Sequence, residues 1–144
     1  RTPMQWTDDE NAGFTDGTPW LAMNPNYRQI NVREQEVRTD SVLAYYRRLV
    51  HLRKAAAYRE TFPYGIFEPE MADVFAYYRV SGESGQRILV AANFGTDAVS
   101  LPLAYPCRQV LLSNLRAESA VETACEKANA LTLESCEVAV IELG

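Results

Sequence analysis

The chain has 144 residues, of which 47% are hydrophobic and 23% are charged, and its net charge is −5. A chain of this length can bury about 68–70% of its unfolded surface, so it can form an apolar core without disulfides or metals. The acidic balance argues against nucleic acid and membrane partners, because phosphate backbones and anionic lipids bind cationic surfaces. These proportions are typical of one globular domain, or of one domain with an appendage.

The three cysteines, Cys107, Cys125 and Cys136, are spaced 18 and 11 residues apart. An odd number without a Cys-x-x-Cys pair indicates neither a disulfide framework nor a metal site. We therefore expect three reduced thiols in a cytoplasmic protein that has no metal and no cofactor. No apolar run reaches the roughly 18 residues of a membrane-spanning helix, and no charged-then-apolar leader precedes the chain. The chain begins at Arg1 without Met, so we expect it to be a piece of a longer protein.

Residues 1–38 show no sustained hydrophobic period and predict a long irregular segment. Prolines and glycines interrupt this stretch at Pro3, Gly13, Gly17, Pro19 and Pro25. Its large apolar residues are Met4, Trp6, Phe14, Trp20, Leu21 and Met23. Such residues need a surface to cover, so we expect the isolated chain to expose them or to self-associate through them.

A helix is predicted to follow, with Thr39 or Asp40 as its N-terminal cap. Its apolar face comprises Val42, Tyr46, Leu49 and Val50, with Arg53 at the end of the same stripe. The opposite face carries Arg47, Arg48, His51 and Lys54. Positive charge in the second half of a helix favours the negative end of its dipole.

From about residue 58 the pattern changes to short alternating segments. The predicted strands are Val74–Val80, Arg87–Phe94, Ala98–Leu103, Gln109–Leu112, Ala130–Leu133 and Val138–Leu143. A Gly-rich turn at residues 82–85 joins the first two as a hairpin, whereas residues 117–129 are predicted to form a loop. Short, closely spaced strands with turn signals between them are typical of a β-sandwich.

The opening motif Arg1-Thr-Pro-Met-Gln-Trp6 is the most specific feature of the chain. It is followed by Asn11-Ala-Gly-Phe14, Pro19-Trp20, Asn24-Pro-Asn-Tyr27 and Ile30-Asn-Val32, and later by a helix with a tyrosine pair and a terminal Leu-Arg-Lys. This series resembles the late part of the catalytic barrel of α-glucosidases in glycoside hydrolase family thirteen, above all the oligo-1,6-glucosidase and dextran glucosidase group. One departure is Thr7, where the resembled enzymes usually carry Asp.

The resemblance implies that Arg1 points into the glucose-binding pocket, where it binds substrate and transfers no proton. A guanidinium offers a planar fork of donors that can bridge sugar hydroxyls and a carboxylate. In the isolated chain, without the barrel, we expect Arg1 to contact nothing. Glycoside cleavage needs two carboxyl groups across the scissile bond, and the resemblance implies that both precede this chain. We therefore assign no catalytic residue, although Asp8, Asp9, Glu10, Glu68 and Glu70 are present.

Other candidate residues have structural interpretations that we favour. Trp6, Trp20 and Tyr27 could stack on sugar rings, but each is embedded in a motif that fastens the segment to the barrel. His51 is a residue type that can act as an acid or a base, yet it has no carboxylate at helical spacing and is expected to be a surface residue. A Phe75–Tyr77 patch on one strand face leaves a carbohydrate-binding module open as an alternative.

The predicted fold is mainly β: an antiparallel β-sandwich of the α-amylase C-terminal type, preceded by an irregular segment and one helix from the end of a (β/α)8 TIM barrel. Residues 1–57 are assigned to the barrel remnant and residues 58–144 to the sandwich. The resemblance implies a parent enzyme that hydrolyses α-glucosidic bonds of short oligosaccharides with retention, its partners being that substrate and the barrel. The sandwich is expected to be a structural cap, and the chain alone to be inactive. The tail of a trehalose-6-phosphate hydrolase or sucrose isomerase remains an alternative.

Overall fold

The computed structural model describes residues 1–54, 64–67, 70–81, 84–116 and 129–144. The chain divides into two compact units, Arg1–His51 and Leu52–Gly144, which are described separately below. Within the described residues, no helix is both long and apolar enough to cross a membrane.

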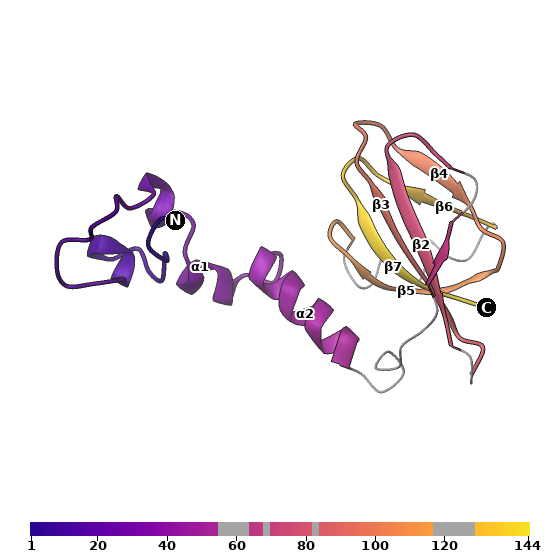
Figure 1. Ribbon diagram of the computed structural model, residues 1–144, viewed down its shortest axis with the longest axis horizontal. Helices are drawn as coiled ribbons and strands as arrows, with labels where there is room; N and C mark the ends of the chain where they lie inside the picture. The colour runs from indigo at the N-terminus through magenta and orange to yellow at the C-terminus, as the bar shows by residue number, and fades with distance from the viewer. Residues whose placement is uncertain (55–63, 68–69, 82–83, 117–128) are drawn as a thin grey trace. The chain divides into compact units, whose positions relative to one another are not determined.

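The first unit contains two short 3₁₀ turns and two helices (Figure 1). These are η1 (Glu10–Gly13), η2 (Pro25–Arg28), α1 (Val32–Val37) and α2 (Val42–Lys54), the last of which continues into the second unit. The prediction that residues 1–38 are irregular throughout was wrong for α1. Its N-terminal cap is Asn31, whose side-chain oxygen accepts a hydrogen bond from the backbone N–H of Glu34 at 2.9 Å. This cap satisfies one of the N–H groups that a helix start leaves unpaired.

Helix α2 is capped one residue later than expected. Ser41, not Thr39 or Asp40, precedes the helix, and its Oγ accepts a hydrogen bond from the N–H of Ala44 at 3.1 Å. Asp40 is instead held by the Arg38 guanidinium in a two-bond pair. All three candidates have suitable oxygens, so the choice between them depends on which side chain points back over the first turn.

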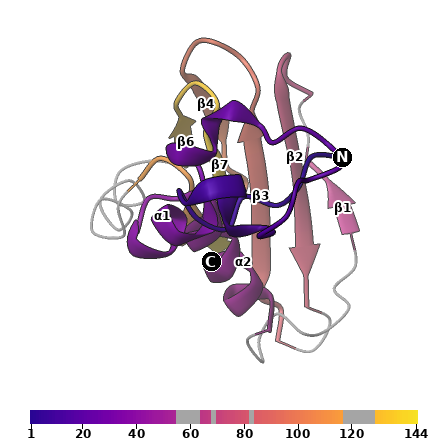
Figure 2. The same cartoon turned by 90° about the vertical axis from the view of Figure 1, so that its left-hand side faces the viewer.

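The second unit consists of two antiparallel sheets. One sheet has five strands in the order β1-β2-β3-β7-β5, and the other pairs β4 with β6. The strands are β1 (Tyr64–Ile66), β2 (Val74–Val80), β3 (Arg87–Asn93), β4 (Val99–Pro102), β5 (Cys107–Ser113), β6 (Ala130–Leu133) and β7 (Val138–Leu143). Both views show β2, β3 and β7 running side by side (Figures 1 and 2). The predicted mainly β, antiparallel fold is therefore confirmed.

The core of this unit lies between the two sheets. Register partners on the five-stranded sheet point to the same side, as in the rows Tyr78–Leu89–Ile141 and Ala76–Ala91–Ala139. Those rows meet apolar side chains of the smaller sheet in one cluster, whose buried members are Phe67, Leu89, Ala91, Leu101, Leu103, Val110, Leu131, Leu133, Ala139, Ile141 and Leu143. Two sheets that pack their apolar faces together define a β-sandwich core.

The hairpin between β2 and β3 forms as predicted. Ser81 N–H donates to Gln86 O at 2.9 Å, and Gly85 adopts a positive φ of 69° that favours glycine. Two other sequence predictions were incomplete. Strand β1 was not predicted, because three residues are too few to show a period, and the predicted loop at residues 117–129 falls, up to residue 128, outside the described residues.

The expectation of three reduced thiols was wrong at Cys107, which is disulfide-bonded at the start of β5. Its partner lies outside the described residues, and Cys136 is a free, exposed thiol. Spacing along the chain cannot reveal such a bond, because the sheet topology decides which cysteines approach one another.

Candidate functional site

Arg1 lies at the exposed start of the first unit. Within the described part of the chain it has neither a hydrogen-bond partner nor an ion-pair partner. The same holds for the hydrogen bonds of Thr2, Pro3 and Met4, although Pro3 is buried. The ordered framework that carries Arg1 therefore begins at Gln5.

Gln5 and Trp6 are fastened to the start of helix α1. The carbonyl of Gln5 accepts from the N–H of Val32 at 2.9 Å, and the carbonyl of Trp6 accepts from the N–H of Arg33 at 3.0 Å. These are the first two N–H groups of α1, which the helix itself cannot satisfy. The Gln5 side chain adds two bonds, donating through Nε2 to Asn26 Oδ1 at 3.0 Å and to Ile30 O at 2.6 Å.

A left-handed turn at residues 11–13 also holds this segment by hydrogen bonds. The N–H groups of Trp6 and Thr7 both donate to the carbonyl of Ala12, at 2.9 and 3.0 Å. Ala12 is fully buried, and Asn11, Ala12 and Gly13 all have positive φ, at 52°, 55° and 64°. A Cβ on Gly13 would stand 2.6 Å from Thr7 Oγ1, so the turn requires glycine there.

Two acidic residues of this segment, Asp8 and Asp9, are engaged in ion pairs. Arg33 bridges Asp8 and Asp9, with one nitrogen 2.8 Å from each carboxylate. The Thr7 hydroxyl and the Arg33 guanidinium hold the pKa of Asp9 below its ordinary value. Both carboxylates share one cation and remain exposed.

An apolar groove of about 500 Å³ runs along the first unit. It is lined by residues from the opening motif, from the start of α1 and from one face of α2, among them Met4, Ile30, Val42, Leu43 and Tyr46. Several of these side chains are open to solvent, Val42 being 76% and Tyr46 62% exposed. The predicted apolar face of the helix therefore forms, but nothing in the described part of this unit covers it.

The aromatic candidates of the first unit do not converge. Trp20 is 87% exposed and Trp6 is 48% exposed, while Tyr27 lies beneath the guanidinium of its neighbour Arg28 at 5.4 Å. His51 is exposed on α2, in agreement with the sequence prediction of a surface histidine. Among the described residues, no group of three or more histidine, cysteine or acidic side chains is arranged to hold a metal ion.

The Phe75–Tyr77 pair lies on the outer face of the five-stranded sheet. The two ring centroids are 5.8 Å apart, and Phe75 is 54% exposed. The register partners of Tyr77 on this face are Ile66 and Val90. These register positions are apolar beside two aromatic rings, whereas the next positions on the same face are Arg79 on β2 and, through its pairing with Ile88, Glu142 on β7.

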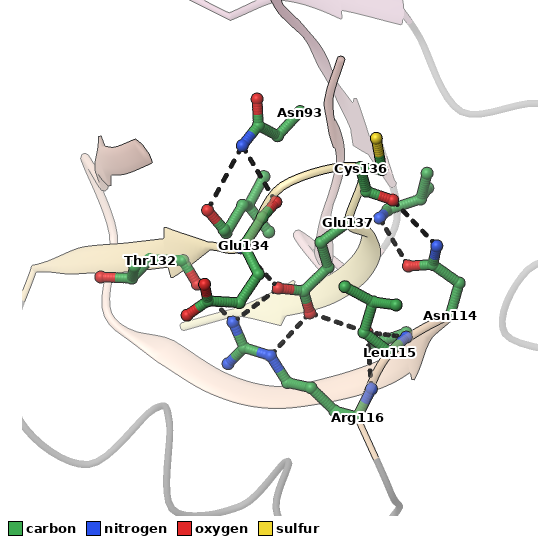
Figure 3. A network of polar contacts seen from close by, with 11 residues as sticks. Asn93, Asn114, Leu115, Arg116, Thr132, Glu134, Cys136 and Glu137 are labelled. Atoms are coloured by element: carbon green, nitrogen blue, oxygen red, sulfur yellow. Dashed lines mark hydrogen bonds and ion pairs between the residues drawn. The ribbon is translucent and has the colours of Figure 1, made fainter. Parts of the chain in front are cut away.

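The second unit contains a buried carboxylate, that of Glu137, at the centre of a network of polar contacts (Figure 3). It is fully buried and accepts hydrogen bonds from Ser113 Oγ at 2.7 Å, from Arg116 Nε at 2.6 Å and from the N–H of Glu134 at 2.9 Å. Arg116 also donates to the carbonyl of Thr132. Burial tends to raise the pKa of Glu137, but the bonds from Arg116, Glu134 and Ser113 outweigh it and lower that pKa.

This network joins the end of β5 to the turn between β6 and β7. Asn93 strengthens the same junction from β3 by donating to the carbonyls of Asp97 and Glu134, at 2.8 and 2.9 Å. A carboxylate that is ionised, buried and fully bonded is not available for proton transfer. We therefore assign Glu137 a structural role, which periodicity could not have revealed because its partners are distant in sequence.

The chain therefore consists of a hydrogen-bonded segment that begins with Arg1 and a β-sandwich that has its own core. Comparison with known proteins agrees. Residues 1–61 match the family model described as alpha amylase, catalytic domain. The chain is 39% identical to an oligo-1,6-glucosidase of Parageobacillus thermoglucosidasius and 40% identical to a glucan 1,6-alpha-glucosidase of Streptococcus pneumoniae, each match covering 85% of this chain and 22% of the relative.

Solved structures and a further relative extend this similarity. The isomaltulose synthase of Klebsiella sp. LX3 superposes with a TM-score of 0.85 at 34% identity, covering 99% of this chain and 25% of that one. A trehalose-6-phosphate hydrolase of Bacillus subtilis is 39% identical over 68% of the chain. The chain belongs to glycoside hydrolase family thirteen, the α-amylase family. It spans about a fifth to a quarter of the length of these relatives.

Proposed function

We propose that the chain is part of an α-glucosidase that hydrolyses α-glucosidic bonds of short oligosaccharides with retention, most similar in action to oligo-1,6-glucosidases. The observation that carries this proposal is the combination of a catalytic-domain match over residues 1–61 with 39% identity to an oligo-1,6-glucosidase across 85% of the chain. Retention requires a covalent glucosyl-enzyme formed by one carboxylate and a second carboxyl group as acid and base. Both would lie in the part of the parent that this chain does not include.

Within that parent we assign residues 1–57 to the end of the barrel and residues 58–144 to the C-terminal β domain. Arg1 is the substrate-binding residue, with its guanidinium bridging glucose hydroxyls and a carboxylate of the pocket. The hydrogen-bonded framework from Gln5 to Arg33 supports this assignment, because it gives the Arg1 end of the chain a fixed base.

The test is a kinetic comparison in the full-length parent with isomaltose, maltose, sucrose and trehalose 6-phosphate as substrates. We expect hydrolysis of isomaltose, with the α-anomer of glucose as first product. Arg1→Ala should lower kcat/KM by a factor of about 30 to 1,000, equivalent to about 2–4 kcal/mol, because the sugar hydroxyls and the carboxylate lose their charged donor. Arg28→Ala, which removes an equally charged, exposed residue of the same unit, is the matched control.

Each outcome separates the alternatives. Hydrolysis of trehalose 6-phosphate alone, or isomerisation of sucrose in place of hydrolysis, would replace the oligo-1,6-glucosidase assignment with that activity. An Arg1→Ala parent whose kcat/KM stays within a factor of about two of wild type would show that Arg1 does not reach the sugar.

For the β domain we propose the role of a structural cap that packs against the barrel. The apolar positions around Tyr77, Ile66 and Val90 on the outer face support this role, because covering apolar side chains with another apolar surface lowers the free energy. The Phe75–Tyr77 ring pair supports a carbohydrate-binding module as the second candidate. Calorimetry with isomaltose, maltotriose and dextran at millimolar concentration should detect no binding to this chain. Saturable binding that Tyr77→Ala abolishes would favour the binding module.

A further inference from the structure

We propose that Gln5 is a positioning residue that sets where the Arg1 guanidinium stands in the glucose pocket. The inference rests on the proposed function, since Arg1 has a substrate to meet only in an active α-glucosidase. It goes beyond that function by naming the side chain through which the rest of the segment controls Arg1.

Gln5 is the first residue of the opening segment that other residues hold by hydrogen bonds. In the described part of the chain, residues 1–4 make no hydrogen bond, whereas Gln5 makes three: its Nε2 donates to Asn26 Oδ1 and to Ile30 O, and its carbonyl accepts from Val32 N–H. The four residues between this anchor and the guanidinium span at most about 14 Å, so a small rotation at Gln5 is amplified at Arg1.

The chemistry at this position requires an amide. Both acceptors, Asn26 Oδ1 and Ile30 O, face the same nitrogen, at 3.0 and 2.6 Å. A primary amide carries two N–H donors and satisfies both at once, whereas a carboxylate would place oxygen against oxygen and a thioether offers no donor. Gln5 is half-buried, so solvent replaces these bonds only in part.

The neighbouring anchor in the opening motif, Trp6, acts through its backbone. Trp6 is held between Arg33 N–H and Ala12 O through its own carbonyl and N–H. Gln5 is thus the residue of the opening motif whose side chain ties this segment to a different part of the fold, namely Asn26 in the η2 turn (Pro25–Arg28) and Ile30, two residues after that turn. A displacement of about 1 Å at a substrate-binding group can cost a factor of about 10² in rate, which makes this tie consequential for catalysis.

The experiment measures kcat and KM for isomaltose in the full-length parent carrying Gln5→Met, Arg1→Ala or both. Methionine has nearly the shape of glutamine but no donor, and Gln29→Met is the matched control because Gln29 is exposed in the same unit. We expect Gln5→Met to lower kcat/KM at least tenfold, mainly through KM, and Gln29→Met to change it less than twofold. In the Arg1→Ala background, Gln5→Met should have less than a twofold further effect, since residues that act as a unit are not additive.

Three results would overturn the inference: unchanged kinetics in Gln5→Met, a change in kcat/KM as large without Arg1 as with it, or an equal loss in Gln29→Met. If Gln5→Met prevents folding, the same kinetics are measured with variants of Asn26, which accepts the hydrogen bond from Gln5. Asn26→Asp keeps the acceptor oxygen and should stay within twofold of wild type, whereas Asn26→Leu removes it and should lose at least threefold. Equal activity of these two would contradict the proposal. A wild-type parent that hydrolyses no α-glucoside would overturn the proposed function and this inference together.

Discussion

The β domain contains large apolar side chains that are fully buried in its core, whereas every large apolar side chain of residues 1–51 is at least partly exposed. Leu89, Leu131 and Ile141 of the β domain are at most 1% exposed. In the first unit, all of which is described, only Pro3 and Ala12 are buried apolar residues, and Trp20, Val42 and Tyr46 are 87%, 76% and 62% exposed. The first unit is held by local hydrogen bonds and exposed ion pairs, such as those of Arg33 with Asp8 and Asp9.

We interpret this difference as that between a self-sufficient domain and a segment of another domain. Two packed sheets bury their apolar faces together, so we expect the β domain to carry its own stability. Exposed ion pairs contribute little, and hydrogen bonds alone do not offset the entropy of ordering a long irregular segment. The framework around Gln5 therefore needs the surface that the groove residues would cover.

The largest expected effect concerns activity. The 144-residue chain should release no nitrophenol from nitrophenyl α-glucoside above background, because the acid and the nucleophile of the proposed parent would lie outside these residues. The assay compares it with the full-length parent at equal molar concentration. Turnover that persists through further purification would show that a catalytic pair had been overlooked.

The next effect concerns the buried ion pair of the β domain. Arg116→Ala should lower the free energy of unfolding by about 3–5 kcal/mol at pH 7, because it leaves the fully buried Glu137 carboxylate without its cation. Urea titration followed by circular dichroism measures this. Arg38→Ala, which breaks an exposed pair in the first unit, is the control and should leave the transition unchanged.

The loss in Arg116→Ala should shrink as the pH falls. The native-state pKa of Glu137 is lowered, so its contribution is fully present above the unfolded pKa of about 4.3 and disappears as the pH falls through the native value. The variant lacks that contribution at every pH, so the difference in stability between the two proteins should narrow as the pH falls from the unfolded pKa through the native pKa. A difference in stability that does not narrow over this acid range would contradict the ionised, paired state of Glu137.

A smaller effect compares the core of one unit with the groove of the other. Leu131→Ala should cost about 2–5 kcal/mol, because Leu131 is 1% exposed and its loss leaves a cavity between the sheets. Val42→Ala should change stability by less than about 0.5 kcal/mol in the same titration, because Val42 faces solvent. Equal losses would mean that the groove is covered in the isolated chain.

The smallest expected effect is self-association through that groove. Sedimentation velocity should show a coefficient that rises with concentration, because the exposed apolar side chains gain from mutual burial. Val42→Lys combined with Tyr46→Lys should weaken the association, whereas Thr39→Lys, at an exposed polar position, should not. A strictly monomeric chain at all concentrations would refute this prediction.

Much of the β domain could be predicted from the sequence, because strand alternation records which side chains face the core. The bounds of Val74–Val80, Ala130–Leu133 and Val138–Leu143 agree with the structure residue for residue. The three-residue strand β1 could not be predicted, since it exists only by pairing with β2. The Glu137 network was equally inaccessible, because it joins residues from β5 and the turn before β7.

The first unit was harder to predict because its contacts follow no period. A signal for α1 was present, because Asn31 stands three residues before Glu34 and caps its N–H, but the residues that precede it show no sustained hydrophobic period. The opening motif identified the family and drew attention to Arg1, whereas the role of Gln5 became visible only when Asn26 and Ile30 were seen to converge on its amide. No sequence pattern records that convergence.

Native-state hydrogen exchange of the 144-residue chain, resolved by residue, tests most directly whether stability resides in the β domain. The account predicts that amides of β3 and β7, such as those of Leu89 and Ile141, exchange only through global unfolding, with the largest protection in the chain. The amides of Trp6, Val32 and Arg33 should exchange faster by several orders of magnitude, although each is hydrogen-bonded. Equal protection in both units would contradict the account, because it would show that the first unit is stable without the surface it is proposed to require.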